Sequence, residues 1–181
     1  EWSNTDSKQW RKVSSRMSTI AVDSIEAKTD GGAVSFPNKP MFQVGLSAHQ
    51  PIAHATDTKV TWNDVQTSSG GFNIGNHFDT SNNWFKPSVS GYYHLIVQLR
   101  LENAAPGFLV VYLKKNGTTI RQQVSVEGND QNSYVTAHTS TILHMNGSSD
   151  YIEIVVNHNA GSTVNLMSNY GQSQFGGYLV G

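Results

Sequence analysis

The chain has 181 residues, a formal net charge of −1 and only 14% charged residues. This length fits one domain with a short appendage, and the near-neutral charge argues against nucleic acid or an anionic membrane as a partner, because either would favour a basic face. The chain has no cysteine, which excludes disulfides and a thiol nucleophile, and no apolar run approaches the ~18 residues of a membrane span.

Residues 1–35 differ in character from the rest. They begin EWSNTDSKQW, without Met or an apolar leader, so we expect a mature or excised part of a longer protein. The apolar spacing that starts at Trp10, Val13 and Met17 is that of a short coiled-coil neck, but STIAVDSI is equally good strand. We expect 1–35 to be a neck, shaft or linker, and both conformations stay open.

From Met41 onward the chain is expected to form strands. β-Branched and aromatic runs are bounded by turn signals such as KNGT, EGND, MNGS and NAGS. Side chains alternate along 93–101, with apolar residues on one face. No helical run separates the strands, so the pattern predicts an antiparallel sandwich or barrel. The expected strands are 41–48, 59–62, 92–101, 107–115, 119–126, 133–145, 150–156 and 175–180.

The chemistry-bearing residues form no catalytic motif. The seven histidines include no H-E-x-x-H and no pair at i+2 or i+4, the spacings that often place two zinc ligands together. G-x-S-x-G is absent and carboxylates are few, so we predict a protein without enzymatic activity, cofactor or metal centre. Calcium is kept as an alternative because oxygen-bearing side chains cluster at 56–59, 129–132 and 157–159. The N-x-[ST] sequences at Asn116 and Asn146 lie in Asn-Gly turns, which explain them without glycosylation.

The stretch FDTSNNWFKPSVSGYYHL, residues 78–95, resembles the central signature of a known family, the globular head of complement subcomponent q and the wider tumour-necrosis-factor-like jelly rolls. Phe85, Pro87, Gly91 and Tyr93 occupy the positions of that signature. VYLKKNG, LHMNGSSDYIEIVV and FGGYLVG resemble later strands of the family, and the resemblance covers 36–181 in order. In two departures from the family pattern, Pro87 stands four residues before Gly91, where three is commoner, and Leu95 replaces an aromatic residue.

The resemblance implies an all-β, antiparallel, ten-stranded jelly-roll sandwich that assembles as a homotrimer and has no catalytic machinery. Apolar residues beyond those needed for the sandwich interior are candidates for subunit contacts. These candidates are Tyr92, Ile96, Phe108, Val110 and Tyr112.

For function, we expect an extracellular recognition head, most simply the receptor-binding tip of a phage tail fibre or spike that binds a host-surface glycan. Amides and aromatic rings on loops can hydrogen-bond to sugars and stack on them. A structural trimerisation cap of a fibre or of a spore- or cell-surface filament, and a secreted lectin-like or complement-like protein, are the alternatives. The candidate ligand residues are Trp62, Asn82, Asn83, Trp84, Asn129, Asn132 and Asn159.

Overall fold

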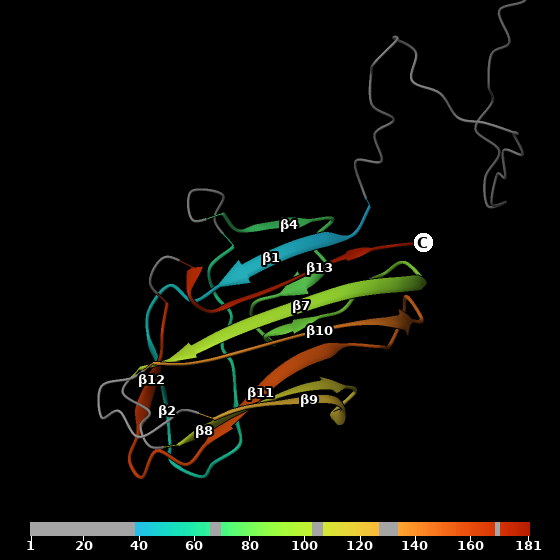
Figure 1. Cartoon of the computed structure of the whole chain (residues 1–181). Coiled ribbons are helices and arrows are strands. Elements are labelled where there is room, and N and C mark those ends of the chain that lie inside the picture. Colours follow the sequence, from blue (N-terminus) through green and yellow to red (C-terminus); the bar gives the residue numbers. More distant parts are fainter. Residues whose placement is uncertain (1–38, 66–69, 103–106, 127–133, 169–170) are drawn as a thin grey trace, which may run out of the picture. The chain divides into compact units, whose positions relative to one another are not determined.

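The computed structural model describes residues 39–65, 70–102, 107–126, 134–168 and 171–181. These residues form two antiparallel sheets packed face to face (Figure 1). The predicted N-terminal segment 1–35 and the candidates Asn129 and Asn132 lie outside the described residues and stay predictions.

The first sheet has seven strands and is built around β7, the 11-residue strand Gly91–Leu101. β10 pairs with β7 along its whole length, from Val135↔Leu101 to Met145↔Gly91. Figure 1 shows β4, β1, β13, β7 and β10 side by side. The other strands are β2 (Gln50–Ile52), β12 (Val164–Leu166), β13 (Gln174–Leu179), β1 (Met41–Gly45), β4 (Phe72–Ile74) and β10 (Val135–Met145).

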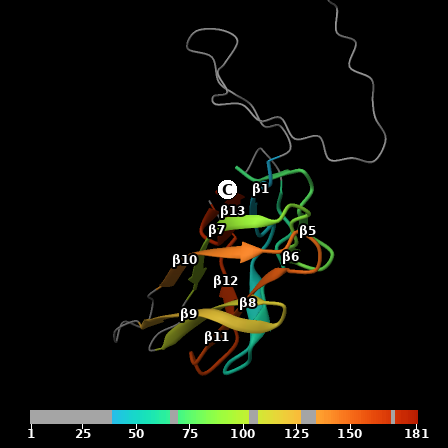
Figure 2. The ribbon, with the colours of Figure 1, turned by 90° about the vertical axis from the view of Figure 1, so that its right-hand side faces the viewer.

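The second sheet has six strands and is built around the pair β11 and β8. In the view turned by 90°, β8, β9 and β11 lie below β7, β10 and β13 (Figure 2). The strands of this sheet are β5 (Phe78–Asp79), β6 (Trp84–Phe85), β11 (Ile152–His158), β8 (Phe108–Lys115), β9 (Thr118–Val126) and β3 (Thr58–Lys59).

The corner that precedes β7 is part of the core. Phe85 and Tyr93 are fully buried, and their ring centroids are 5.3 Å apart. Pro87, two residues after Phe85, is also buried. The Tyr93 hydroxyl donates a hydrogen bond to the Val89 carbonyl at 2.7 Å, and burial raises the pKa of Tyr93 to about 12. A Cβ at Gly91 would lie 2.8 Å from the Gly181 oxygen, so the close approach of the last strand requires glycine there. The signature residues are therefore architectural, as predicted.

The core between the sheets is rich in aromatic rings. Phe42 stacks on Phe85 at 4.4 Å between centroids and meets Phe175 edge-on at 4.9 Å. Aromatic pairs in these geometries add to the free energy gained from burial alone. Along β7, Tyr93, Leu95, Val97, Leu99 and Leu101 are all fully buried, which confirms the alternation expected from the sequence.

The predicted all-β jelly-roll sandwich is confirmed. The described residues contain thirteen strands where ten were expected, because segments of two or three residues such as β3, β5 and β6 count separately. In the part of the chain that the structure describes, no helix is long and apolar enough to cross a membrane.

Candidate functional site

The outer face of the seven-stranded sheet carries side chains in cross-strand rows, because directly paired residues point to the same side of a sheet. We use "the seven-stranded face" for these outward residues of β1, β4, β7, β10 and β13. One row is apolar and aromatic, one is centred on a glycine, and one is polar. The rows, read from β4 or its side toward β10, are Ile74, Met41, Tyr178, His94, Ile142; then Phe72, Gln43, Gly176, Ile96, Ser140; then Asp64, Gly45, Gln174, Gln98, His138.

Large apolar side chains on the seven-stranded face are exposed. Ile142 is 61% exposed, Tyr92 57%, Ile96 47% and Tyr178 43%. Monomeric proteins rarely leave apolar residues contiguous over such a surface, and larger patches mark interaction sites. The seven-stranded face thus has the composition of an interface.

Two hollows in this face lie over glycines, Gly176 inside β13 and Gly45 at the end of β1. A glycine inside a strand often marks a place where a ligand or another chain approaches closely. The hollow over Gly176 has a volume of about 300 Å³ and is walled by Phe72, Ile96 and Tyr178. The hollow over Gly45 has a volume of about 310 Å³. Gln43 and Gln174 line both hollows, so the hollows are neighbours.

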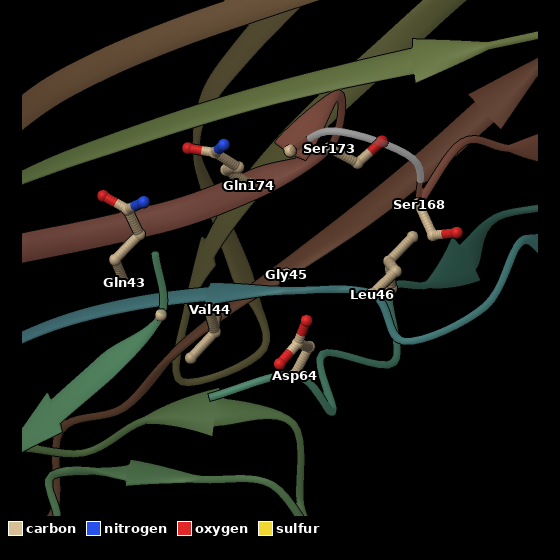
Figure 3. A pocket seen from close by; sticks show the side chains of 10 residues that line it. Gln43, Val44, Gly45, Leu46, Asp64, Ser168, Ser173 and Gln174 are labelled. Atoms are coloured by element: carbon tan, nitrogen blue, oxygen red, sulfur yellow. The ribbon is translucent and has the colours of Figure 1, made fainter. Parts of the chain in front are cut away.

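The hollow over Gly45 is the more polar of the two (Figure 3). Its lining includes the side chains of Gln43, Gln174, Asp64, Ser168 and Ser173. Amides and hydroxyls both donate and accept hydrogen bonds, whereas a carboxylate only accepts. The amides of Gln43 and Gln174 thus offer donors and acceptors in this hollow, whereas Ser173 is fully buried and its Oγ accepts the Arg100 N–H at 3.3 Å.

Three histidines also lie on the seven-stranded face. His94 is 3.2 Å from the Tyr178 hydroxyl through Nδ1, and the two rings meet edge-on. His144 meets the Tyr92 ring edge-on at 5.3 Å between centroids. His138 is exposed and pairs with Gln98. Each imidazole thus stands beside aromatic or neutral polar neighbours.

The outer face of the six-stranded sheet is constructed differently. Lys59 Nζ lies 2.6 Å from Glu153 Oε2 and 5.3 Å from the centroid of the Trp84 ring. The ring of Trp84 packs against Tyr151 at 4.4 Å between centroids. Partners from the same chain therefore cover much of this face, and Trp84 is only partly available to a ligand.

Trp62 was predicted as a ligand residue, and the structure corrects this. Its side chain is 1% exposed, and its ring lies 6.0 Å from that of Phe175 between centroids. A tryptophan in a short strand-like run fits either a core or a loop position, and in the structure Trp62 lies in the core. Trp62 cannot stack on a sugar.

The remaining ligand candidates are not gathered into one site. The Asn82 amide donates to Asp79 at 2.6 Å, and this bond, with backbone N–H donors of the same turn, lowers the Asp79 pKa. Asn83 follows with a φ of 54°, a turn conformation that Asn tolerates. Asn159 follows the far end of β11, and its Oδ1 accepts the Phe108 N–H at 2.7 Å. These asparagines hold turns and strand ends.

The five predicted subunit contacts are divided between two faces. Tyr92 and Ile96 lie on the seven-stranded face. Phe108, Val110 and Tyr112 point outward from β8 in the other sheet, and Val110 is only 6% exposed within its own chain. The five residues therefore do not form one patch, because alternation assigns a residue to a face of its strand but does not say which sheet the strand joins, and their role as subunit contacts stays a prediction.

Two of the segments considered for calcium, 56–59 and 157–159, contact each other, and the contact is a hydrogen bond between side chains. The Asn157 amide donates to Asp57 Oδ1 at 2.7 Å, so the amide nitrogen, not its oxygen, faces the carboxylate. Among the described residues, no three His, Asp or Glu side chains are grouped as a metal site would require. Segment 129–132 lies outside the described residues.

The two N-x-[ST] asparagines are held by their own turns. Asn116 Nδ2 donates to Asp150 Oδ1 at 2.8 Å, and its Oδ1 accepts the Tyr151 N–H at 2.9 Å. Asn146 Oδ1 accepts the N–H groups of three following residues. The Lys115 ammonium, 2.8 Å away, and then Asn116 lower the pKa of Asp150 to about 2. Both asparagines are structural, as the turns predicted.

Sequence reasoning missed the hollow over Gly45. A signal existed, since MFQVG and QFGGYL place glycines and glutamines at alternating strand positions. The pairing of β1 with β13, which brings these positions together, joins segments about 130 residues apart. A single sequence does not give that register.

The family model for the C1q domain matches residues 41–180. The globular domain of the zebrafish complement 1qA protein superposes with a TM-score of 0.52 at 18% sequence identity, covering 79% of this chain and 98% of that one. No curated protein matches. At 18% identity, the structural likeness speaks for the fold alone.

Proposed function

This chain belongs to the C1q-domain family, and on that premise we propose that it is a non-enzymatic recognition head that assembles as a homotrimer. C1q domains are typically extracellular modules that self-associate and bind ligands or receptors. The observation that carries the proposal is the exposed apolar part of the seven-stranded face, with Tyr92, Ile96, Ile142 and Tyr178 at its centre. Three copies packed around one axis through the end of the face that holds these side chains would remove them from water, and the hollow over Gly45, toward the other end of the same strands, would stay open.

The mass of the full chain in solution tests the trimer. Light scattering after size-exclusion chromatography at micromolar concentration should return three times the 19.8-kDa chain mass. A mass of one chain would refute the trimer and leave the apolar face unexplained.

We further propose that the ligand is a glycan and that the setting is the tip of a phage tail fibre or spike. The supporting features are a cysteine-free chain rich in Asn, Ser and Thr, and the amide- and hydroxyl-lined hollow over Gly45. Gln43 and Gln174 are the residues we assign to ligand hydroxyls, since their amides can donate and accept at once.

A glycan array probed with the trimer tests the ligand class. We expect reproducible binding to a small set of saccharides, and at least about tenfold weaker binding for Gln43→Ala/Gln174→Ala, since one or more hydrogen bonds are lost. Gln122→Ala is the matched control, because Gln122 is exposed on β9 in the other sheet. Unchanged binding by the double variant would remove the ligand from this hollow.

The array also distinguishes a receptor-binding tip from a purely structural cap. A trimer that binds no glycan above background would favour a trimerisation cap of a fibre or surface filament over a receptor-binding tip. Tail or lysis genes beside the coding sequence would favour the phage setting over a secreted lectin-like or complement-like protein.

A further inference from the structure

The hollow over Gly176 has walls that suit an apolar group. Phe72, Ile96 and Tyr178 form these walls, and no described side chain that lines the hollow is charged at neutral pH. Its polar side chains are glutamine amides and the Tyr178 hydroxyl. Transfer of an apolar group from water to such walls is favourable, whereas an unpaired charge placed there would lose its hydration.

The floor of this hollow is backbone. A Cβ at Gly176 would lie 3.2 Å from the Phe42 carbonyl oxygen, so β1 and β13 approach closely at this point. A glycine inside a strand weakens the strand and often marks a place where another chain comes near. The depression is therefore a fixed feature of the paired strands and does not depend on the position of a loop.

Ile142 is the apolar side chain that its own chain leaves most open. It is 61% exposed, the largest value among the large apolar side chains of the described residues. Tyr92 is nearly as exposed, at 57%, but its ring is already in contact with His144. Ile142 shares a cross-strand row with Tyr178, so it lies at the same end of the seven-stranded face as the hollow.

Within one chain, Ile142 cannot reach this hollow. β10 and β4 are the opposite edges of this part of the sheet (Figure 1). At a strand spacing of ~4.8 Å, Ile142 is about 10 Å from Gly176 on β13 and about 19 Å from Phe72 on β4. In a closed ring, neighbouring copies meet through different patches, so one edge of a copy faces the opposite edge of the next.

We propose that the hollow over Gly176 in each copy receives the Ile142 side chain of the next copy around the axis. Each copy then gives one side chain and accepts another, and three such contacts close the ring. This inference rests on the proposed homotrimer and names the contact that holds it together.

Removal of the Ile142 side chain tests its contribution. Full burial of one isoleucine corresponds to about tenfold in association or more, and the ring repeats the contact three times. Ile142→Ser should therefore raise the dissociation constant of the trimer by about a thousandfold or more, measured by sedimentation equilibrium. Ile120→Ser is the matched control, because Ile120 is 43% exposed on β9 in the other sheet, and its dissociation constant should not change.

A pair of new cysteines tests the position of the contact, and the chain has no cysteine of its own. After oxidation, full-length Ile142→Cys/Phe72→Cys should give covalently linked dimers and trimers on a non-reducing gel. The separation within one chain far exceeds the ~7 Å between Cα atoms that a disulfide allows, so each link must join two copies. Each single variant, and Ile120→Cys/Phe72→Cys as the matched control, should remain monomeric on the gel.

The other outcomes also decide the question. Where circular dichroism shows that Phe72→Cys is unfolded, Ile142→Cys/Tyr178→Cys replaces the first pair, since its two positions are also about 10 Å apart within one chain. A trimeric wild type without links in a folded pair would overturn the inference and leave the trimer standing, as when the hollow takes an apolar group of a ligand. Links in Ile142→Cys alone would mean that Ile142 meets its own copies at the axis, which also overturns it. A monomeric wild type refutes the trimer and this contact together.

Discussion

The two outer faces of the sandwich belong to sheets of similar size, but their outward side chains differ in exposure and in charge. On the six-stranded sheet, outward Val110 and Val155 are only 6% and 7% exposed, and Lys59 pairs with Glu153 beside Trp84. On the seven-stranded sheet, outward Ile96 is 47% exposed, and no strand carries a carboxylate. The first face is covered largely by its own chain.

This difference indicates what each face is for. An ion pair and ring contacts within one chain keep a surface compatible with water, whereas uncovered isoleucine and tyrosine beside neutral polar groups fit an interface core, where charged residues are depleted. The comparison therefore predicts that a new charge disrupts assembly on one face and is tolerated on the other.

The largest expected effect comes from placing a carboxylate on each face in turn. Ile96→Asp should weaken trimer association by more than about a thousandfold, because three unpaired charges would be buried together. Val124→Asp is the matched control, since Val124 is 44% exposed, close to the 47% of Ile96, and pairs with Val110 on the other face. Sedimentation velocity at pH 7.5 should give a monomer for the first variant and a trimer for the second.

The reverse result would exchange the roles of the faces. If Val124→Asp were monomeric and Ile96→Asp trimeric, the subunit contacts would lie on β8 and β9, where Phe108 and Tyr112 would be the relevant residues.

The next effect concerns the charges that stabilise the six-stranded side within one chain. Asp150→Asn should lower the free energy of unfolding near pH 7 by about 2 kcal/mol, since the pKa of Asp150 is about 2 in the folded chain and ordinarily near 3.8. The depressed pKa stabilises the fold above pH 4, and this is lost as the pH falls from 4 to 2. Urea unfolding in the monomeric Ile96→Asp background measures it, and equal pH profiles with and without Asp150 would contradict it.

Sequence alone predicted the parts of this architecture that follow from local spacing. The period of two along 93–101 assigned Tyr93, Leu95 and Val97 to the interior, and the corner residues Phe85 and Pro87 were recognised as core. Such features depend on neighbours in the chain, so one sequence contains them.

Features made by pairing distant strands were not predictable in the same way. The hollow over Gly45 needs the register of β1 against β13, and the placement of Tyr112 needs the knowledge that β8 joins the other sheet. Trp62 failed for a related reason, since a ring of that size fits a core or a binding loop equally well until its neighbours are known.

A smaller effect concerns the acid sensitivity of folding. Burial lowers the pKa of His77, whose Nδ1 accepts the Ser88 N–H at 3.3 Å. A lowered histidine pKa means that the unfolded chain binds the proton more readily, so stability is complete above pH 6.5 and falls below it. In the Ile96→Asp background, the free energy of unfolding should decrease between pH 7.5 and pH 5.5. His77→Gln should make this decrease smaller by up to about 1 kcal/mol. A loss of equal size in both chains would show that His77 does not contribute.

The smallest effect is expected from the ion pair between Lys59 and Glu153 on the outer face of the six-stranded sheet. Lys59 and Glu153 have side chains 35% and 15% exposed, and partly exposed pairs contribute about 0.5 kcal/mol because water and salt screen them. A double-mutant cycle of Lys59→Met and Glu153→Gln, measured by urea unfolding in the monomeric background, should give that coupling, smaller still in 1 M salt. Neither variant should alter the trimer mass in the wild-type background. A coupling above about 2 kcal/mol would mean that this face depends on its charges for stability, and a change in mass would mean that it, too, contacts another subunit.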